Sequence, residues 1–242
     1  MVWDINERSA HDVVEEILAY GLDASYDVVD LADDASVDAA GAAVRQRIGG
    51  IDFLINNAGI VTGKTFLEQN HHDVERTFQI NTLALYRVTR QFLPNMAAND
   101  FGSITVVASA ASLTGVARQT DYAASKWAAH GFIESLRAEM RHYGHAIHTL
   151  SVHPFYVDTG MFQGASSPNM LLPILEPETV VHKIFRAIES GKRQLILPST
   201  AALAKWLQLL PVPVADQVSD LLGINSTMDH FTGRAAPVET QS

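Results

Sequence analysis

The pattern of apolar and polar positions changes period repeatedly along the chain. Short apolar runs, which are typical of buried strands, alternate with longer stretches in which apolar residues recur at helical spacing. The predicted strands cover residues 26–31, 52–55, 102–108, 147–152 and 194–197. The predicted helices cover residues 7–19, 34–48, 71–96, 201–210 and 214–222, and two more begin near Asp121 and at Pro177. This alternation predicts an α/β fold, with a parallel sheet covered by helices on both faces.

The length and composition fit one domain with a full core. The chain has 242 residues, of which 47% are hydrophobic, and this size is natural for a single α/β domain. We assign residues 1–224 to this domain and expect residues 225–242 to form a loose polar tail. The formal net charge of −10 speaks against a nucleic-acid partner.

The sequence points neither to secretion nor to a membrane span. The chain has no cysteine, which excludes disulfide bonds and thiolate chemistry. No apolar stretch approaches the ~20 residues that cross a bilayer, and residues 1–4 lack signal-peptide character. We therefore expect a cytoplasmic protein. Two histidine groups, at 71–72 and 142–148, lack the spacing of a metal site and should be solvated, so we expect no metal.

Tyr122 and Lys126 are the first candidates for catalysis. They are four residues apart at the start of a predicted helix, so both side chains should lie on one helix face. A tyrosine ionises near pH ~10, and a neighbouring ammonium group favours the phenolate and lowers this pKa. Such a tyrosine can exchange a proton with an alcohol near neutral pH. The alternative is a pair of ordinary surface residues on a helix.

Polar residues at three other places are further candidates. Asn56-Asn57-Ala58-Gly59 follows a predicted strand, where it forms either a ligand-binding turn or an ordinary one. Asn81 lies inside a long predicted helix, although asparagine competes there for backbone hydrogen bonds. Ser109 stands at the carboxyl end of a strand, the edge where open α/β sheets bind ligands. No G-x-S-x-G elbow surrounds Ser109, which disfavours a hydrolase.

In this order and spacing, residues 56–59, Asn81, Ser109, Tyr122 and Lys126 resemble the short-chain dehydrogenase/reductases, and the resemblance covers nearly the whole chain. It implies a Rossmann-type, doubly wound, three-layer fold and an oxidoreductase that interconverts an alcohol and its carbonyl. It also implies four catalytic roles. Tyr122 exchanges the proton, Lys126 lowers the pKa of that tyrosine and bonds the nicotinamide ribose, Ser109 holds the substrate oxygen, and Asn81 anchors a water in a proton relay.

The resemblance implies a nicotinamide cofactor. Asp4, followed by Ile5, stands where a carboxylate can bond both ribose hydroxyls of NAD and repel the extra phosphate of NADP, so NAD is expected rather than NADP. The alternative for Asp4 is an acid that stabilises a helix N-terminus. The other cofactor contacts implied by the resemblance are Asp30, Leu31, Asn56, Ala58, Gly59, Tyr122, Lys126, Pro154, Val157 and Thr159. Phe155 departs from the glycine that is usual after this proline.

The start of the chain also departs from the family pattern. Members open with a strand and a glycine-rich turn that binds the cofactor pyrophosphate, and no G-x-x-x-G-x-G stretch precedes Asp4. We therefore expect a truncated version of the fold that lacks the first strand and the phosphate loop. The rival to the enzyme is thus a non-catalytic fragment, or a partner-binding module that cannot hold cofactor.

A narrower resemblance is to the retinol dehydrogenase and 17-beta-hydroxysteroid dehydrogenase subgroup, carried by residues 3–6, 56–64, 159–162 and 228–234. It implies a secondary or lipidic alcohol, and the matching carbonyl, as substrate. The apolar segment 170–175 lines a lipophilic pocket or packs in the core.

The two terminal apolar helices have three possible environments, namely a membrane surface, the core and a partner subunit. Peripheral membrane contact is therefore one expectation for this chain. By analogy with the family, a homodimer or homotetramer is another.

Overall fold

A computed structural model of the chain describes residues 1–234. Its strands are β1 (Val2–Asp4), β2 (Tyr26–Val28), β3 (Phe53–Asn56), β4 (Gly102–Val107), β5 (Ile147–Pro154) and β6 (Gln194–Leu197). Its α-helices are α1 (Glu7–Ala19), α2 (Asp34–Ile48), α3 (His71–Phe78), α4 (Ala84–Ala98), α5 (Thr120–Tyr143), α6 (Pro177–Glu189), α7 (Leu203–Leu207) and α8 (Val212–Leu221). The alternation predicted from the sequence is confirmed.

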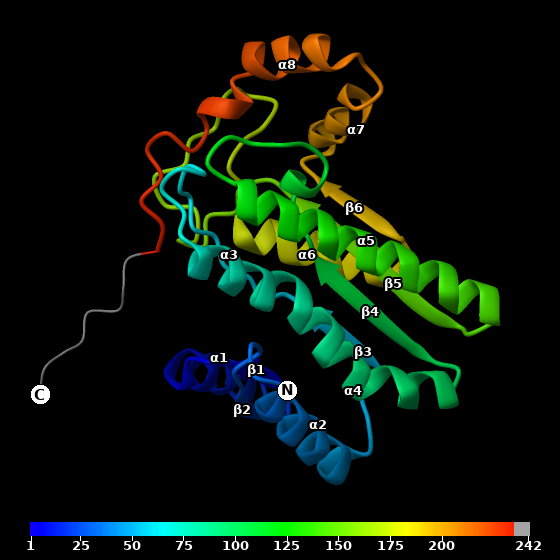
Figure 1. The fold of residues 1–242 in the computed structure, drawn as a ribbon. Helices are drawn as coiled ribbons and strands as arrows, with labels where there is room; N and C mark the ends of the chain where they lie inside the picture. Colours follow the sequence, from blue (N-terminus) through cyan, green and yellow to red (C-terminus); the bar gives the residue numbers. More distant parts are fainter. Residues whose placement is uncertain (235–242) are drawn as a thin grey trace, which may run out of the picture.

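All strand pairs are parallel, and helices cover both faces of the larger sheet (Figure 1). Side chains from α2, α4 and α5 form one core with β3 and β4, and this core includes Val44, Phe92, Ile104 and Ile133. Leu150 and Val152 of β5 pack with Ala187 of α6 in a separate cluster. The three-layer Rossmann-type arrangement is therefore confirmed.

The strands form two sheets rather than one. Strand β1 pairs only with β2, whereas the larger sheet has the order β3-β4-β5-β6. A cavity of about 350 Å³ separates β1 from β3, and both strands line it. Phe53 and Ile55 of β3 are more than two-fifths exposed. Within residues 1–234, no strand bridges β1 and β3, in agreement with the expected lack of the first strand.

Local capping explains where three helices begin. The side chain of Asn6 accepts a hydrogen bond from the Ser9 N–H at the start of α1, and Asp33 caps α2 in the same way. Asn70 and Asp73 form a reciprocal capping box at the start of α3. These side chains satisfy backbone N–H groups that have no partner inside the helix.

Three predicted elements differ in the structure. The strand expected at 26–31 ends at Val28, because Asp30 accepts a hydrogen bond from the Ala32 N–H and forms a turn. The helix expected at 71–96 is divided by a π-helical turn, Gln79–Leu83. The helix expected at 201–210 is a 3₁₀ turn, Ser199–Ala202, followed by the short α7.

The expected loose tail is packed over its first part. Thr227 and Met228 are buried, and a Cβ added at Gly63 would lie 2.0 Å from the Phe231 ring. The polar composition of residues 225–234 did not predict these contacts, because only a few residues of this segment make them, with a loop that is distant in the sequence. Residues 235–242 of the predicted tail lie outside the described residues.

Candidate active site

Helix α5 carries Tyr122 and Lys126, and both side chains are buried, so the alternative of two surface residues is wrong. The Lys126 ammonium donates a hydrogen bond to the Val107 carbonyl at 2.9 Å, where β4 ends. The same nitrogen lies 5.8 Å from the centroid of the Tyr122 ring. The helix therefore delivers both groups to the carboxyl edge of the larger sheet.

Burial governs the protonation of this pair. It raises the pKa of Tyr122 well above its ordinary value, although a hydrogen bond with Ser109 opposes the change. It also lowers the pKa of Lys126 to about 8. The pKa of Tyr122 is thus raised overall by desolvation, and the expected lowering of this pKa by Lys126 stays a prediction. Tyr122 is consequently a neutral phenol at pH 7, the form that can give up a proton.

Ser109 is held in place by its own backbone. It caps the 3₁₀ turn Ala110–Ser112, and its hydroxyl accepts a hydrogen bond from the Ala111 N–H at 3.1 Å. Its carbonyl accepts the Ser112 hydroxyl hydrogen at 2.5 Å. The Ser109 side chain is therefore fixed at the end of β4, next to Tyr122.

His153 contacts Ser112, which is in turn hydrogen-bonded to Ser109. The sequence analysis did not identify His153 as a site residue. It is fully buried in β5, and burial lowers its pKa to about 3, so the ring is neutral. Its Nδ1 atom lies 2.8 Å from the Ser112 Oγ atom. Because Ser112 gives its only hydrogen to Ser109, the His153 Nδ1–H must be the donor. A histidine within an apolar strand was the only signal in the sequence.

Asn81 lies in the π-helical turn and ties a loop to α5. Its Oδ1 atom accepts a hydrogen bond from the Ile60 N–H at 2.8 Å, and its amide nitrogen donates to the Ile60 carbonyl at 2.9 Å and to Ser125 Oγ at 3.0 Å. The π turn, a feature common at functional sites, directs this buried side chain toward the loop after β3. Its role in a proton relay remains a prediction.

The loop after β3 passes close to Lys126 and Asn81 and borders the cavity beside Tyr122. A Cβ atom at Gly59 would lie 3.2 Å from the Lys126 nitrogen and 3.3 Å from the Asn81 oxygen, so glycine allows this close approach. The buried Asn56 amide nitrogen has no hydrogen-bond partner among the residues that the structure describes. Both features fit a polar group bound beside β3.

Two adjoining cavities meet at Ser109 and Phe155. The first has a volume of about 330 Å³ and brings together seven predicted site residues, Gly59, Ser109, Tyr122, Lys126, Pro154, Val157 and Thr159. The second, of about 280 Å³, is almost entirely apolar and is lined by residues from α7 and from the segment 169–172. Phe155 packs against Tyr156 with ring centroids 4.4 Å apart and forms part of the wall between them.

The remaining predicted cofactor residues lie elsewhere. Asp4, Leu31, Asn56 and Ala58 line the cavity between β1 and β3, whereas Ile5 and Asp30 line none of the three cavities described above. One Asp4 oxygen accepts the Asn6 N–H at 2.8 Å. The cavity between β1 and β3 and the one beside Tyr122 share Asn57 in their walls, so the two parts of the predicted cofactor site adjoin there.

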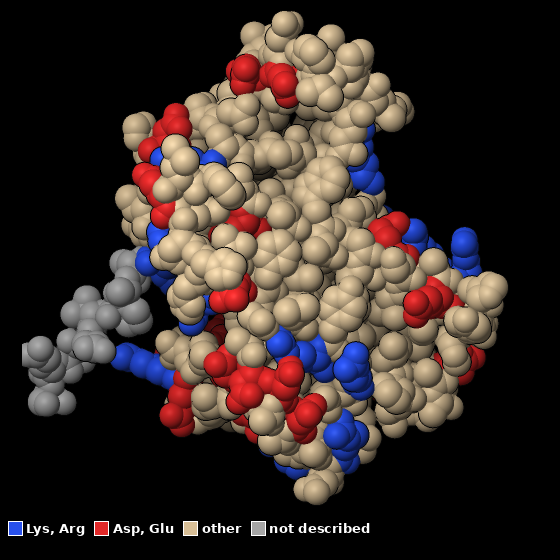
Figure 2. All heavy atoms as spheres, viewed as in Figure 1, with Lys and Arg blue, Asp and Glu red and all other residues tan. Residues whose placement is uncertain are grey.

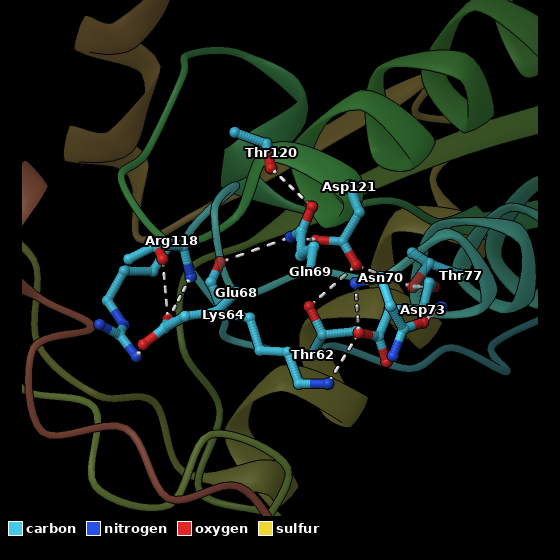
Figure 3. Close-up of polar contacts among 11 residues, drawn as sticks. Thr62, Lys64, Glu68, Gln69, Asn70, Asp73, Thr77, Arg118, Thr120 and Asp121 are labelled. Carbon is cyan, nitrogen blue, oxygen red and sulfur yellow. Dashed lines mark hydrogen bonds and ion pairs between the residues drawn. The ribbon is translucent and has the colours of Figure 1, made fainter.

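Asp121, next to Tyr122, anchors a network that the sequence did not reveal (Figure 3). Its buried carboxylate accepts hydrogen bonds from Thr62 and Thr77 at 2.9 Å and from Gln69 at 2.8 Å. Thr120 binds the other end of the Gln69 amide. The network joins the loop after β3, α3 and the first turn of α5, and so fixes the position of the Tyr122 backbone.

Two larger features are absent from residues 1–234, a metal site and a membrane-spanning helix. Among residues 1–234, no group of three or more histidine, aspartate or glutamate side chains is placed to hold a metal ion. In the same part of the chain, no helix is long and apolar enough to cross a membrane.

Comparisons with known proteins agree with this geometry. The family model described as short chain dehydrogenase matches residues 1–169. Epidermal retinol dehydrogenase 2 of Homo sapiens is 37% identical over 238 residues, covering 96% of this chain and 76% of the relative. Estradiol 17-beta-dehydrogenase 11 of Mus musculus is 33% identical over 209 residues, covering 86% and 70%.

A solved structure shows the same fold. It is an alcohol dehydrogenase from the archaeon Thermococcus sibiricus complexed with 5-hydroxy-NADP, with a TM-score of 0.71 and 20% identity over 81% of this chain and 83% of that one. The buried Tyr122, Lys126 and Ser109 at one sheet edge complete the agreement. This chain therefore belongs to the short chain dehydrogenase family of oxidoreductases, which bind NAD(P) and act on alcohols and carbonyls.

Proposed function

We propose that this chain uses NAD to interconvert a lipophilic secondary or lipidic alcohol and its carbonyl, with Tyr122 as the acid/base. The observation that carries the proposal is the meeting of two cavities at Ser109, one lined by Tyr122 and Lys126 and the other apolar. A reacting oxygen beside Ser109 has the phenol on one side and space for an apolar body on the other.

The proton chemistry follows from the burial of Tyr122. In carbonyl reduction, the neutral phenol donates a hydrogen bond and then its proton to the substrate oxygen as that oxygen gains negative charge. The Ser109 hydroxyl holds the same oxygen. In oxidation, the phenol must first lose its proton, which the Lys126 ammonium favours once both groups face the substrate. A bound nicotinamide supplies or accepts the hydride.

The site fits the nicotinamide half of the cofactor. Lys126 and Gly59 line the cavity beside Tyr122, and the Lys126 ammonium has donors beyond the one given to Val107 that suit the ribose hydroxyls. Pro154, Val157 and Thr159 line the same cavity. For the adenosine half, the exposed Asp4 carboxylate at the carboxyl end of β1 favours NAD over NADP by charge.

Lipophilic substrates are supported by the surface around the second cavity. Trp206, Leu209, Val212 and Leu221, in and around α7 and α8, are each more than three-fifths exposed. Figure 2 shows this end of the molecule as mostly uncharged, apart from one acidic patch over α8. Exposed apolar patches of this kind mark membrane or protein contacts. We propose peripheral contact with neutral lipid, because the chain's net charge of −10 opposes anionic lipid.

The alternative to this proposed function is that the chain keeps the catalytic residues but cannot bind the cofactor. The cavity between β1 and β3, where no strand joins the two sheets within residues 1–234, is the observation that favours it. A homodimer or homotetramer remains an expectation from the family.

The proposal is tested by following NADH formation from the chain with a panel of lipophilic alcohols. We expect turnover with NAD that exceeds turnover with NADP and that disappears in Tyr122→Phe. A folded chain that binds NADH and turns over no alcohol or carbonyl would contradict the proposal. A folded chain that binds no NADH would support the rival.

A further inference from the structure

The apolar cavity has one polar group in its wall that lacks a partner. Gln119 lies at the N-cap of α5, three residues before Tyr122, and is 1% exposed. It lines the apolar cavity, and its Oε1 atom has no hydrogen-bond partner among residues 1–234. A buried acceptor without a partner is costly, and such groups in native proteins require an explanation.

The orientation of the Gln119 amide follows from a chain of hydrogen bonds. The Thr227 hydroxyl donates its only hydrogen to the Ile224 carbonyl at 2.9 Å. Thr227 must therefore accept from the Tyr156 hydroxyl, 2.9 Å away, which uses the only hydrogen of Tyr156. The Tyr156 oxygen can then only accept from Gln119, at 3.0 Å. The amide nitrogen of Gln119 thus faces Tyr156, and its oxygen is the atom left over.

The five other polar residues in the cavity wall have partners within the chain, and they are Ser109, Thr114, Tyr156, Asn169 and Thr200. Asn169 uses both ends of its amide, donating to the Leu222 carbonyl at 3.0 Å and accepting from the Leu171 N–H at 2.9 Å. Thr200 and Thr114 each donate their hydroxyl hydrogen to a backbone carbonyl. Gln119 is thus the side chain in this wall whose acceptor a ligand would satisfy.

We propose that Gln119 is a specificity-determining residue that accepts a hydrogen bond from a second hydroxyl group on a lipophilic substrate. This rests on the proposed function, in which the first hydroxyl reacts at Tyr122 beside Ser109. The apolar wall disfavours a charged group in this cavity, whereas a neutral hydroxyl supplies the missing donor. The Gln119 oxygen is itself buried, and the soft terminal torsion of the amide lets it turn toward the cavity when a donor is bound there. Lipophilic diols are therefore the substrate class.

The test compares probes that differ only in one donor. Linear α,ω-diols of six to twelve carbons are titrated by calorimetry against the matching ω-methoxy alcohols, which keep the oxygen but lose its hydrogen. At the chain length that spans the cavity, we expect the diol to bind about twofold to tenfold more tightly. Gln119→Met should abolish this preference. Leu203→Ala, which trims the apolar wall, should weaken both ligands equally and keep it.

Each outcome of this experiment either supports or overturns the assignment of Gln119. Equal binding of diol and ether at every length, binding of neither, or a preference that survives in Gln119→Met would overturn the assignment. The comparison of diol and ether in the unmodified chain holds even if the methionine variant does not fold. Preferential binding of a diol that is never oxidised with NAD would contradict the proposed function and leave the role of Gln119 in recognition intact.

Discussion

The larger sheet and the small β1–β2 sheet hold their polar residues in different ways. Around the larger sheet, Asn81, Asp121 and Lys126 are buried, and their hydrogen bonds reach elements far away in the sequence. On the small sheet side, Asp4 and Asp30 each use a carboxylate oxygen in a turn within two residues. The three residues around the larger sheet are thus fixed by the tertiary fold, whereas Asp4 and Asp30 are fixed by local structure. On the small sheet, Asp27 is the residue that accepts long-range hydrogen bonds, from Trp3 and Arg47.

This difference separates catalysis from cofactor choice. A residue held by long-range hydrogen bonds affects both activity and stability, because its removal leaves buried partners unsatisfied. An exposed residue in a local turn affects only the ligand that it meets. Variants in the two regions should therefore behave differently, and the predictions below proceed from the largest expected effect to the smallest.

Tyr122→Phe should lower turnover by about 10²-fold to 10⁴-fold, the usual contribution of a general acid or base. The phenol oxygen is the group that exchanges the proton, and the ring remains to fill the site. Circular dichroism and NADH binding serve as controls and should be unchanged. A variant that keeps more than about a tenth of the turnover would remove Tyr122 from this role.

Asp121→Ala should lower the free energy of unfolding by about 2–4 kcal/mol, because Thr62, Thr77 and Gln69 would lose a charged acceptor. Asp121→Asn, which keeps one acceptor oxygen, should lose less. Urea denaturation measures both changes. A loss below about 0.5 kcal/mol for the alanine variant would show that the network does not hold the start of α5.

Lys126→Met should stabilise the fold at pH 7 while abolishing activity. The lowered pKa of Lys126, about 8 against an ordinary 10.5, means that charging the buried amine costs about 3 kcal/mol below pH 8. Loss of the hydrogen bond to Val107 offsets about 1 kcal/mol, which leaves a net gain of about 2 kcal/mol.

The difference in stability between Lys126→Met and the unmodified chain should depend on pH. Between pH 8 and 10.5, unfolding of the unmodified chain takes up a proton, so its stability rises relative to the methionine variant. The advantage of the variant should therefore shrink over this range and disappear above it. Urea denaturation of both chains from pH 7 to 11 checks this, and an advantage that does not change with pH would contradict it.

Asp4→Asn should have the smallest effect, a shift of about tenfold in the affinity ratio of NADH to NADPH, with no change in stability. The side chain is exposed, and an asparagine oxygen can still accept the hydrogen bond from Asn6. Fluorescence titration with both cofactors measures the ratio. An unchanged ratio would mean that Asp4 only stabilises the start of α1.

The fold and the residues that we propose for catalysis were accessible from the sequence because they depend on spacing. The spacing of four positions from Tyr122 to Lys126, and the position of Ser109 after an apolar run, have direct structural meaning. The period of the apolar residues also predicted the parallel order of strands and helices.

Other features were not accessible, because they arise from pairs of residues distant in the sequence. Asp121, Gln119 and His153 look like ordinary polar residues until the fold buries them beside their partners. The raised pKa of Tyr122 has the same origin, since desolvation depends on everything that covers the ring. The packed segment 225–234 was missed because its composition is polar.

The central claim is that the larger sheet by itself forms the nicotinamide half of the site. Its most direct test is a fluorescence titration of the chain with NADH and with reduced nicotinamide mononucleotide, which lacks the adenosine half. We predict saturable binding of both, within about tenfold of each other, and loss of both in Lys126→Met. A folded chain that binds neither, or a Lys126→Met variant that binds both unchanged, would contradict the account.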